Sequence, residues 1–460
     1  MLTPDIFKAN DIRGIVTGPS PQWDEAGARL LGELWVDVLH LQPGAELVLG
    51  HDMRLTSPVL SAAFAAGVTR RGVTVHDIGL ASTDELWFAS GRLDLPGVMF
   101  TASHNPGQWN GIKFCLPGAR PVAPEQLAEL ARRALAGEQV AAATEPGEVR
   151  TVDLLGEYAA RLHSLVDLSG IRRLTVVADA GNGMAGHTLP AVFSPLDVEL
   201  IGLYTDPDGT FPNHQPNPLE PENLVDAQRA VVEHGADLAL VFDGDADRCF
   251  IIDERGEVVN PSTLTAVIAA QELAREPGAV IVRNTITSRA VDEIVGECGG
   301  RVVVTRVGHT YVKAAMAEHG AIFGGEHSAH YYFRDFWGAD TGMLAALHTI
   351  ALAGRSDRPL SELVADFCRY TASGEINSTV PDAPACLAEV ASAFEGRGEI
   401  SYEDGLLVTG DDWWVNLRAS NTEPLLRLNV EARDQATNDR LRDEVLAIVA
   451  RHTPAVEGKN

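Results

Sequence analysis

The segment LVLGHDMRLTSPVLSAAFAAGVTRRGVTVHDIG, residues 47–79, decides the fold class. It opens with an apolar run at 47–50, passes through a polar turn into a helical period from Ser57, and closes with a β run at 73–77. Two strands that flank one helix in this way predict a βαβ unit, whose strands are parallel and whose helix covers a face of the sheet.

The same pattern occurs twice more along the chain. LTVVADAGNGMAGHTLPAVF begins at residue 174 and precedes a β run at 198–201, and AVIVRNTITSRAVDEIVGECGGRVVVTRVG occupies residues 279–308. A repeat of this length exceeds the repeats of solenoid proteins. We therefore expect three similar α/β domains in series, each with a mixed but mostly parallel sheet.

The end of the chain follows a different order. WWVNLRASNTEPLLRLNVEARD, residues 413–434, indicates strand, loop and strand, and residues 437–452 have the period of an amphipathic helix. This order predicts a smaller C-terminal α+β domain. We expect the four domains to cover residues 1–147, 148–253, 254–370 and 371–460.

Composition narrows the classes of function. Of the 460 residues, 45 % are hydrophobic, which is enough for each domain to bury a core. The first ten residues do not resemble a signal peptide, and no apolar stretch approaches the roughly 20 residues that span a bilayer. These features predict a soluble, cytoplasmic protein. The five cysteines are scattered without a C-x-x-C pair, which predicts free thiols rather than disulfides or a zinc site.

The formal net charge of −28 disfavours nucleic acid and anionic membranes as partners. The same charge repels phosphorylated metabolites. A phosphorylated substrate therefore requires lysines and arginines to be concentrated at its binding site.

An acidic loop follows one apolar strand directly. In LALVFDGDADRCFIID, residues 238–253, the strand at 238–242 ends in Asp243, Asp245 and Asp247. Residues two apart in an extended loop face the same way, so these carboxylates predict a site for a hard divalent ion, Mg²⁺ or Ca²⁺. A solvated acidic turn is the alternative. An EF-hand fails because Arg248 stands where that loop needs glycine.

A second loop displays a serine and a lysine. VMFTASHNPGQWNGIKF, residues 98–114, places Ser103 where an apolar strand opens, ten residues before Lys113. A hydrolase nucleophile would need a G-x-S-x-G elbow, which is absent, and a helix cap disagrees with the Pro-Gly pair that follows. A phosphoryl group carried on Ser103, with Lys113 moving a proton, accounts for both residues.

Two further loops have polar side chains suited to a sugar phosphate. In GEHSAH, Glu326 and Ser328 lie two apart and can bind vicinal hydroxyls, although a β-bulge explains this motif equally well. In RASNTEP, Arg418 offers a bidentate fork beside a tight polar loop, which indicates a phosphate cradle more than a simple turn. The sequence has no P-loop motif, so it does not indicate nucleoside triphosphate binding of that type.

TASHNP, DGDADR, GEHSAH and RASNTEP, in this order, resemble the phosphoserine, metal, sugar and phosphate loops of the α-D-phosphohexomutase family. NDIRG at 10–14 and VGHTYVK at 307–313 resemble further segments of that family, so the likeness extends over essentially the whole chain. It implies four domains around a central cleft. Asn10 departs from the tyrosine that bacterial phosphomannomutase/phosphoglucomutase members often have there.

The resemblance also implies a mechanism. Phosphorylated Ser103 would convert a hexose monophosphate to a 1,6-bisphosphate, which turns over and returns its other phosphoryl group to the serine. It implies Mg²⁺ held by phosphoserine 103 and the three aspartates, and a hexose 1,6-bisphosphate as activator. Lys113 would be the leading proton shuttle, with His104 and His309 as further candidates. The implied substrate-binding residues are Arg13, Arg248, Glu326, Ser328, His330, Arg418, Ser420, Asn421 and Thr422.

The expected activity is reversible phosphoryl transfer between O1 and O6 of mannose phosphate, glucose phosphate or both. The alternatives are a phosphoglucosamine mutase, a Mg²⁺-dependent sugar-phosphate phosphatase and a non-catalytic sugar-phosphate binding protein. The expected partner is a small sugar phosphate, with neither nucleic acid nor membrane. The preferred hexose and the oligomeric state, monomer or dimer, stay open at this point.

Overall fold

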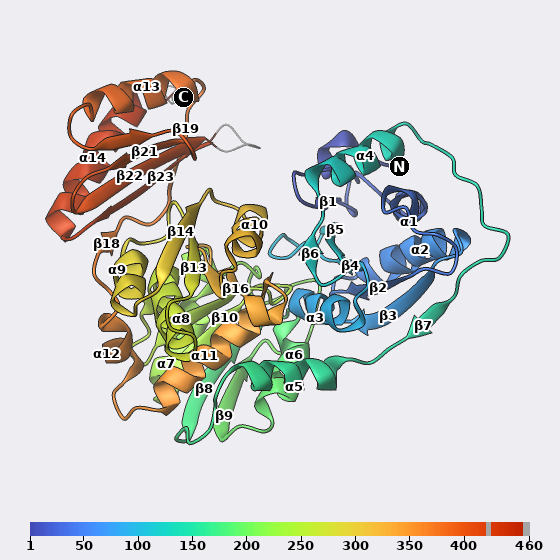
Figure 1. The fold of residues 1–460 in the computed structure, drawn as a ribbon, viewed down its shortest axis with the longest axis horizontal. Coiled ribbons are helices and arrows are strands. Elements are labelled where there is room, and N and C mark those ends of the chain that lie inside the picture. The colour runs from blue at the N-terminus through green and yellow to red at the C-terminus, as the bar shows by residue number, and fades with distance from the viewer. Residues whose placement is uncertain (420–424, 454–460) are drawn as a thin grey trace.

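The computed structural model describes residues 1–419 and 425–453. The chain forms four units, each built on its own sheet, which follow one another along an arc (Figure 1). The first unit (blue) and the fourth (red) lie at the two ends of that arc, and the second and third lie between them. Three α/β units and a distinct C-terminal unit confirm the predicted fold class.

The first sheet has the strand order β1-β5-β4-β2-β3-β7, with β6 beside β5. Its strands are β1 Ile12–Ile15, β2 Glu46–His51, β3 Thr74–Leu80, β4 Gly97–Phe100, β5 Trp109–Leu116, β6 Arg120–Pro121 and β7 Val149–Thr151. Its helices are α1 Glu25–Val38, α2 Ser57–Arg70, α3 Thr83–Leu93 and α4 Pro124–Leu135, after a 3₁₀ turn at Pro4–Ile6.

The second sheet has the order β12-β11-β10-β8-β9, and the third has the order β14-β13-β15-β16-β17. The second unit contains α5 Leu155–Leu165, β8 Leu174–Asp179, α6 Ala185–Phe193, β9 Val198–Leu203, α7 Val225–His234, β10 Leu238–Phe242, β11 Cys249–Asp253 and β12 Val258–Val259. The third contains α8 Pro261–Arg275, β13 Val280–Asn284, α9 Ala290–Glu297, β14 Arg301–Thr305, α10 His309–His319, β15 Phe323–Gly325, β16 Tyr331–Phe333, β17 Ala339–Asp340, α11 Gly342–Gly354 and α12 Leu360–Ala365.

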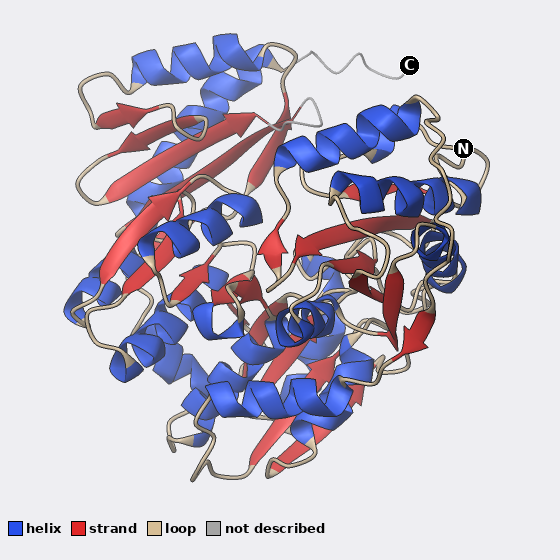
Figure 2. Cartoon of the chain, turned by 45° about the vertical axis from the view of Figure 1, so that its right-hand side comes forward, coloured by secondary structure: helices blue, strands red, loops and turns tan. Residues whose placement is uncertain are grey.

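The fourth sheet has the order β18-β23-β22-β21-β20, with β19 also beside β23. Its elements are β18 Thr371–Ala372, β19 Ile376–Thr379, α13 Ala383–Ala393, β20 Glu399–Ser401, β21 Leu406–Thr409, β22 Trp413–Ala419, β23 Leu425–Ala432 and α14 Gln435–His452. The two helices contact each other and pack on the sheet, and the strands are antiparallel throughout. Figure 2 shows helices lying against strands in all four units.

The first three sheets are mixed, as expected, but parallel pairs do not predominate. In each sheet, pairs on one side are parallel and pairs on the other are antiparallel. The reason lies in the functional loops. The loops after β4, β10 and β15 each join two antiparallel neighbours, so at each of them the chain returns as a hairpin, and these hairpins lie outside the three segments that were predicted as βαβ units.

The strand sequences are continuous apolar runs because both faces of the sheets are buried. In β2, Leu47 and Leu49 face the core beneath α1 and α2, whereas Val48 faces a second core on the other side of the sheet. This second core extends through the second and third units as far as Leu360, and α11 packs against β8 and β11 of the second sheet. The three α/β units are therefore joined by shared apolar packing.

A 3₁₀ turn at Pro221–Asn223 leads into α7, and the Asn223 side chain donates a hydrogen bond to the main chain of the preceding proline-rich loop. One helix end differs from the sequence expectation. The last helix begins two residues early, at Gln435, where Asp434 caps it by accepting a hydrogen bond from the Thr437 amide. Strands β7 and β12 lie beyond residues 147 and 253 but complete the sheets that precede these residues. The domain boundaries stay a proposal.

No helix in the described ranges is long and apolar enough to cross a membrane.

A buried carboxyl group predicts how the stability of the fold depends on pH. Glu85 on α3 is 2 % exposed, and burial, with the neighbouring Asp84, raises its pKa to about 8. In the unfolded chain this carboxyl loses its proton near its usual pKa of 4.5. Between these two values the folded protein binds the extra proton, so stability falls as pH rises, by at most about 1.4 kcal/mol per pH unit.

Glu85→Gln removes the carboxyl group that holds this proton. The free energy of unfolding, measured with denaturant, should therefore fall less steeply from about pH 6.5 to about pH 8 than in the wild type. The window avoids most of the titration of Asp84, whose pKa is raised to about 6. Glu157→Gln on the surface serves as the control. An unchanged slope in Glu85→Gln would show that Glu85 is ionised throughout this range.

Candidate active site

Two loops from different units meet at the centre of the molecule. The loop after β4 carries Ser103, and the loop between β10 and β11 carries the three aspartates. Ser103 is 4 % exposed, and its hydroxyl donates a hydrogen bond to Asp243 Oδ2 at 2.8 Å. The structure thus joins residues that are 140 positions apart in the sequence.

The loops touch so closely that one position between them requires glycine. A Cβ atom at Gly244 would lie 2.4 Å from the main-chain oxygen of Ser103, inside any allowed contact distance. The glycine of the DGDAD motif is therefore needed for the approach of the Ser103 loop. This requirement is separate from the metal-binding role that the sequence suggested for the neighbouring aspartates.

Left-handed backbone occurs at a non-glycine residue in each of three predicted functional loops. The φ angles are 47° at Ser103, 62° at Ala246 and 65° at Ala329. Side chains rarely adopt this conformation, and when they do the surrounding structure must hold it. The strained residues turn the chain sharply at the points where polar side chains gather.

Asp243, Asp245 and Asp247 form a compact acidic cluster. Each contributes one oxygen to a group whose members lie within 4.8 Å of one another, and all three are buried. Lys113 Nζ lies 2.7 Å from Asp245 Oδ2 and 2.5 Å from Asp247 Oδ2, and Arg248 Nη2 lies 2.8 Å from Asp243 Oδ2. Two cations thus face three buried carboxylates.

Burial and these cations set the protonation of the cluster. Burial raises the pKa of Asp243 to about 7, although Arg248 acts in the opposite direction. Burial also raises the pKa of Asp245, but Lys113 lowers it by more, so the net shift is downward. The pKa of Lys113 moves upward because Asp245 and Asp247 outweigh the effect of burial, and its ammonium stays charged.

The cluster fits a hard cation. Oδ1 of Asp245 and Oδ1 of Asp247 are buried and have no hydrogen-bond partner among the described residues. Unpartnered buried carboxylate oxygens are costly, and oxygen is the ligand that Mg²⁺ prefers. These two atoms are the ones that a bound cation would satisfy.

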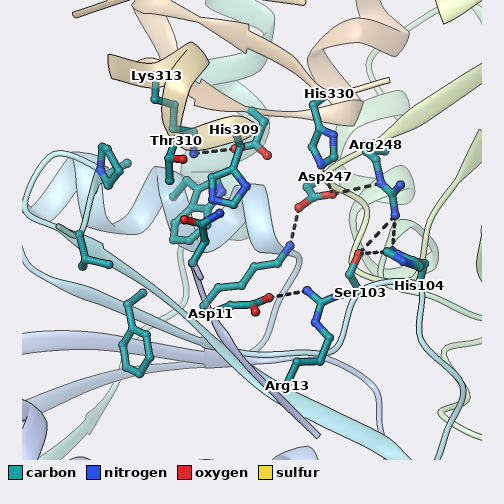
Figure 3. A pocket seen from close by; sticks show the side chains of 18 residues that line it. Asp11, Arg13, Ser103, His104, Asp247, Arg248, His309, Thr310, Lys313 and His330 are labelled. Atoms are coloured by element: carbon teal, nitrogen blue, oxygen red, sulfur yellow. Dashed lines mark hydrogen bonds and ion pairs between the residues drawn. The ribbon is translucent and has the colours of Figure 1, made fainter. Parts of the chain in front are cut away.

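A cavity of about 200 Å³, here called the inner cavity, opens beside Ser103. The predicted site residues that line this cavity are Arg13, Ser103, His104, Lys113, Asp247, Arg248, His309 and His330. Figure 3 shows His309, Thr310 and Lys313, from α10, entering from the side opposite Arg13. The first, second and third units all contribute side chains to the lining of this cavity.

The histidines of the inner cavity are neutral at pH 7. Burial and Arg248 lower the pKa of His104 well below its usual value, and Arg248 Nη2 lies 2.6 Å from His104 Nδ1. Burial and Lys313 lower the pKa of His309 to about 4, and burial also lowers the pKa of His330. Neutral imidazoles can accept a proton, whereas the charged Lys113 can donate one.

A second cavity of about 620 Å³, the outer cavity, adjoins the first. Asn10, Asp11, Arg13 and His309 line both, so the two form one continuous cleft. Arg418, on β22 of the fourth unit, lines the outer cavity. The other predicted cradle residues, Ser420, Asn421 and Thr422, lie outside the described residues.

The predicted sugar loop lies at the edge of this site. Glu326 is 2 % exposed and lines neither cavity. Its Oε1 accepts hydrogen bonds from the Asn284 amide and the Gly308 main chain, and its Oε2 accepts one from the Tyr332 hydroxyl. The Ser328 hydroxyl is 2.9 Å from His330 Nδ1, and only His330 of this loop's predicted residues lines the inner cavity.

Sequence reasoning missed the residue that holds the Ser103 loop. Arg54 is fully buried and donates hydrogen bonds to four main-chain oxygens of this loop, those of Ser103, Asn105, Pro106 and Trp109, at 2.7–3.1 Å. Asp52 accepts a further bond from its Nε at 3.1 Å. The only sequence signal was an Asp-x-Arg pair at the end of a strand, in GHDMR.

The comparisons with known proteins cover most of the chain. Four domain families of phosphoglucomutase/phosphomannomutase match it: alpha/beta/alpha domain I at residues 4–141, domain II at 156–256, domain III at 260–370 and the C-terminal domain at 375–448. These ranges parallel the four units of the fold.

Curated relatives and a solved structure are similar along nearly their full length. The chain is 40 % identical over 438 residues to a Xanthomonas campestris protein named "Phosphohexose mutases", covering 95 % of this chain and 96 % of the relative. It is 40 % identical to the Salmonella typhimurium phosphomannomutase, covering 93 % and 94 %. A phosphoglucomutase/phosphomannomutase family protein of Burkholderia thailandensis has a TM-score of 0.88 at 31 % identity, covering 99 % of both chains.

Arg54 generates a prediction. Arg54→Met removes the hydrogen bonds that the guanidinium donates to four main-chain oxygens and leaves the buried Asp52 charge without its cation, so the free energy of unfolding should fall by about 3–5 kcal/mol. Arg54→Lys keeps the charge but loses the guanidinium fork, so we expect a protein that still folds and whose kcat is at least about tenfold lower. Arg92→Lys, on the surface, is the control. Wild-type kcat in Arg54→Lys would contradict the positioning role.

Proposed function

The chain belongs to the phosphoglucomutase/phosphomannomutase family and is a phosphohexomutase, and we propose that it moves a phosphoryl group reversibly between O1 and O6 of a hexose through phosphorylated Ser103. Mannose 6-phosphate and mannose 1-phosphate, or the glucose equivalents, are the proposed substrate and product. The observation that carries the proposal is the 2.8 Å contact of the Ser103 hydroxyl with the acidic cluster, at one end of a cleft whose other end is lined by arginines.

In the proposed reaction, the phosphoryl group leaves Ser103 Oγ and is taken by a free hydroxyl of the hexose monophosphate. The bond from phosphorus to Ser103 breaks as the bond to the sugar oxygen forms, and the product is a hexose 1,6-bisphosphate. The bisphosphate turns over in the cleft and returns its other phosphoryl group to Ser103. A catalytic amount of free bisphosphate would rephosphorylate enzyme that has lost its phosphoryl group.

Each transfer also moves a proton. The sugar hydroxyl loses its proton as it attacks, and Ser103 Oγ gains one as it leaves. Lys113 is charged, so it is placed to give a proton to the serine oxygen. His309 is neutral and lines both parts of the cleft, so it is placed to accept the proton of the sugar hydroxyl.

Asp243, Asp245, Asp247 and phosphorylated Ser103 are the proposed ligands of Mg²⁺. When bound, this ion would neutralise negative charge on the phosphoryl oxygens. The acidic cluster and its two unpartnered buried oxygens support this proposal. Arg248 holds Asp243 and reaches toward the serine, with Nη2 at 3.5 Å from Ser103 Oγ.

The proposed substrate-binding residues lie in both parts of the cleft and at its edge. Arg13, Arg248 and His330 line the inner cavity, and Arg418 lines the outer one with the proposed cradle loop beside it. Glu326 and Ser328 stay the proposed contacts of the sugar hydroxyls. Since both carboxylate oxygens of Glu326 already accept protein hydrogen bonds, binding a sugar there requires one of these bonds to be exchanged.

The outer cavity and the Ser103 contact favour this function over two of its alternatives. A sugar-phosphate phosphatase would use Ser103 and the acidic cluster with water as acceptor, and would have no use for a second cationic cavity. A non-catalytic binding protein would not need a serine hydrogen-bonded to buried carboxylates. Phosphoglucosamine mutase activity stays an alternative, to be decided by comparing the three hexose phosphates in one assay.

Turnover of mannose 6-phosphate with a trace of hexose 1,6-bisphosphate tests the function. We expect mannose 1-phosphate to form without matching release of inorganic phosphate, and Ser103→Ala to lose at least about a thousandfold in kcat while remaining folded, because the group that carries the phosphoryl is gone. Ser169→Ala, on the surface, is the control. Stoichiometric phosphate release would identify a phosphatase instead.

Metal removal tests the acidic cluster. A chelator should abolish isomerisation, and added Mg²⁺ should restore it. Asp247→Asn, which removes one ligand charge beside the unpartnered oxygen, should require a higher Mg²⁺ concentration for half-maximal activity. Full wild-type activity of Asp247→Asn in chelator would exclude a catalytic metal at this cluster.

A further inference from the structure

The outer cavity contains two cations, Lys8 and Arg306, that have no carboxylate or main-chain acceptor among the residues that the structure describes. Nearly all lysines and arginines among residues 1–419 and 425–453 lie within 4.0 Å of a carboxylate or donate a hydrogen bond to a main-chain oxygen. The exceptions are Lys8, Arg301, Arg306 and Arg440. Two of these four, Lys8 and Arg306, line the outer cavity. In a chain with a net charge of −28, unpaired cations that share one cavity indicate an anionic ligand.

Two further arginines of this cavity, Arg418 and Arg427, are only loosely paired. Arg418 Nη2 lies 3.9 Å from Glu375 Oε2, and Arg427 Nη1 lies 3.6 Å from Glu375 Oε1. Charge-assisted hydrogen bonds are about 2.7–2.9 Å long, so Glu375 balances the charge of both guanidinium groups without satisfying their donors. A phosphate dianion between them would make shorter bonds than this carboxylate does.

The carboxylates that line the cavity are already engaged. Asp11 Oδ2 lies 2.6 Å from Arg13 Nη2. Asp404 is 5 % exposed, and its Oδ2 accepts hydrogen bonds from the Thr285 hydroxyl and the Val307 main chain. The charge left available to a ligand in this cavity is therefore positive.

Arg306 is placed by the structure to face this cavity. It lies between the end of β14 and the start of α10, three residues before His309, which lines both cavities. Its guanidinium lies over the ring of Tyr311, 5.3 Å from the ring centre, and this contact restricts the side chain. Lys8 approaches from the first unit, so the four cations come from three different units of the fold.

We propose that Lys8 and Arg306 clamp the phosphoryl group that is not being transferred, together with Arg418 and Arg427, and that Glu375 is the internal counter-ion that this phosphoryl group displaces. The inference rests on the proposed function, which places Ser103 at the opposite end of the cleft. The ligand class is a phosphate monoester dianion on a hexose. Because the clamp draws on three units, binding of this group ties the first, third and fourth units together.

Titration calorimetry on the Ser103→Ala protein, with mannose 6-phosphate as the probe, tests the clamp without turnover. Arg306→Gln and Lys8→Gln should each raise the Kd about tenfold, and the dependence of binding on salt should become shallower. Glu375→Gln should change the Kd in the opposite direction, lowering it several-fold, because it removes the competing carboxylate. Inorganic phosphate, as a sugar-free probe, should show the same order of affinities.

Arg301→Gln is the matched control, since Arg301 is an exposed, unpaired arginine at the other end of β14 and lines neither cavity. Its Kd should stay within about twofold of the parent, as expected for a distant screened charge. An unchanged Kd in Arg306→Gln, or an equal loss in Arg301→Gln, would overturn the clamp. Failure of the wild-type enzyme, with Ser103 intact, to isomerise any hexose phosphate would overturn the proposed function instead, since the calorimetric readout on Ser103→Ala needs no turnover.

Discussion

The arrangement of the molecule depends on the repulsion among three buried carboxylates. Asp243, Asp245 and Asp247 lie within 4.8 Å of one another on one loop of the second unit. Arg248 on the same loop balances part of this charge, but Lys113 has to come from β5 of the first unit. The site therefore exists only where the two units meet, and the shared apolar core keeps them together.

A second constraint is backbone geometry. The Ser103 loop reaches the acidic loop because Ser103 has a left-handed backbone, Gly244 leaves room for its main-chain oxygen, and Arg54 satisfies four of the loop's main-chain oxygens. Strain at Ser103 and the burial of a charge at Arg54 are both unfavourable by themselves. Both are offset by the hydrogen bonds that the guanidinium donates, which fix the strained loop.

The sequence allowed the local features to be predicted and not the long-range ones. The strand at 238–242 and the loops around Ser103 and Asp243 could be predicted because apolar runs and polar loop residues are adjacent in the chain. Arg54 could not, because its acceptors are main-chain oxygens about 50 positions away. The equal share of antiparallel pairs was missed for a similar reason: a βαβ pattern does not show that each functional loop turns back as a hairpin. The buried partners of Glu326 also depend on tertiary contacts.

The central claim is that Ser103, placed against the acidic cluster, carries the phosphoryl group between the enzyme and the sugar. Its most direct test is to load the protein with isotopically labelled hexose 1,6-bisphosphate, locate the label by peptide mass spectrometry, and then add unlabelled mannose 6-phosphate. The account predicts label on the Ser103 peptide that passes to the sugar bisphosphate on this addition. Label on another residue of the active enzyme, or label released only as inorganic phosphate, would contradict it.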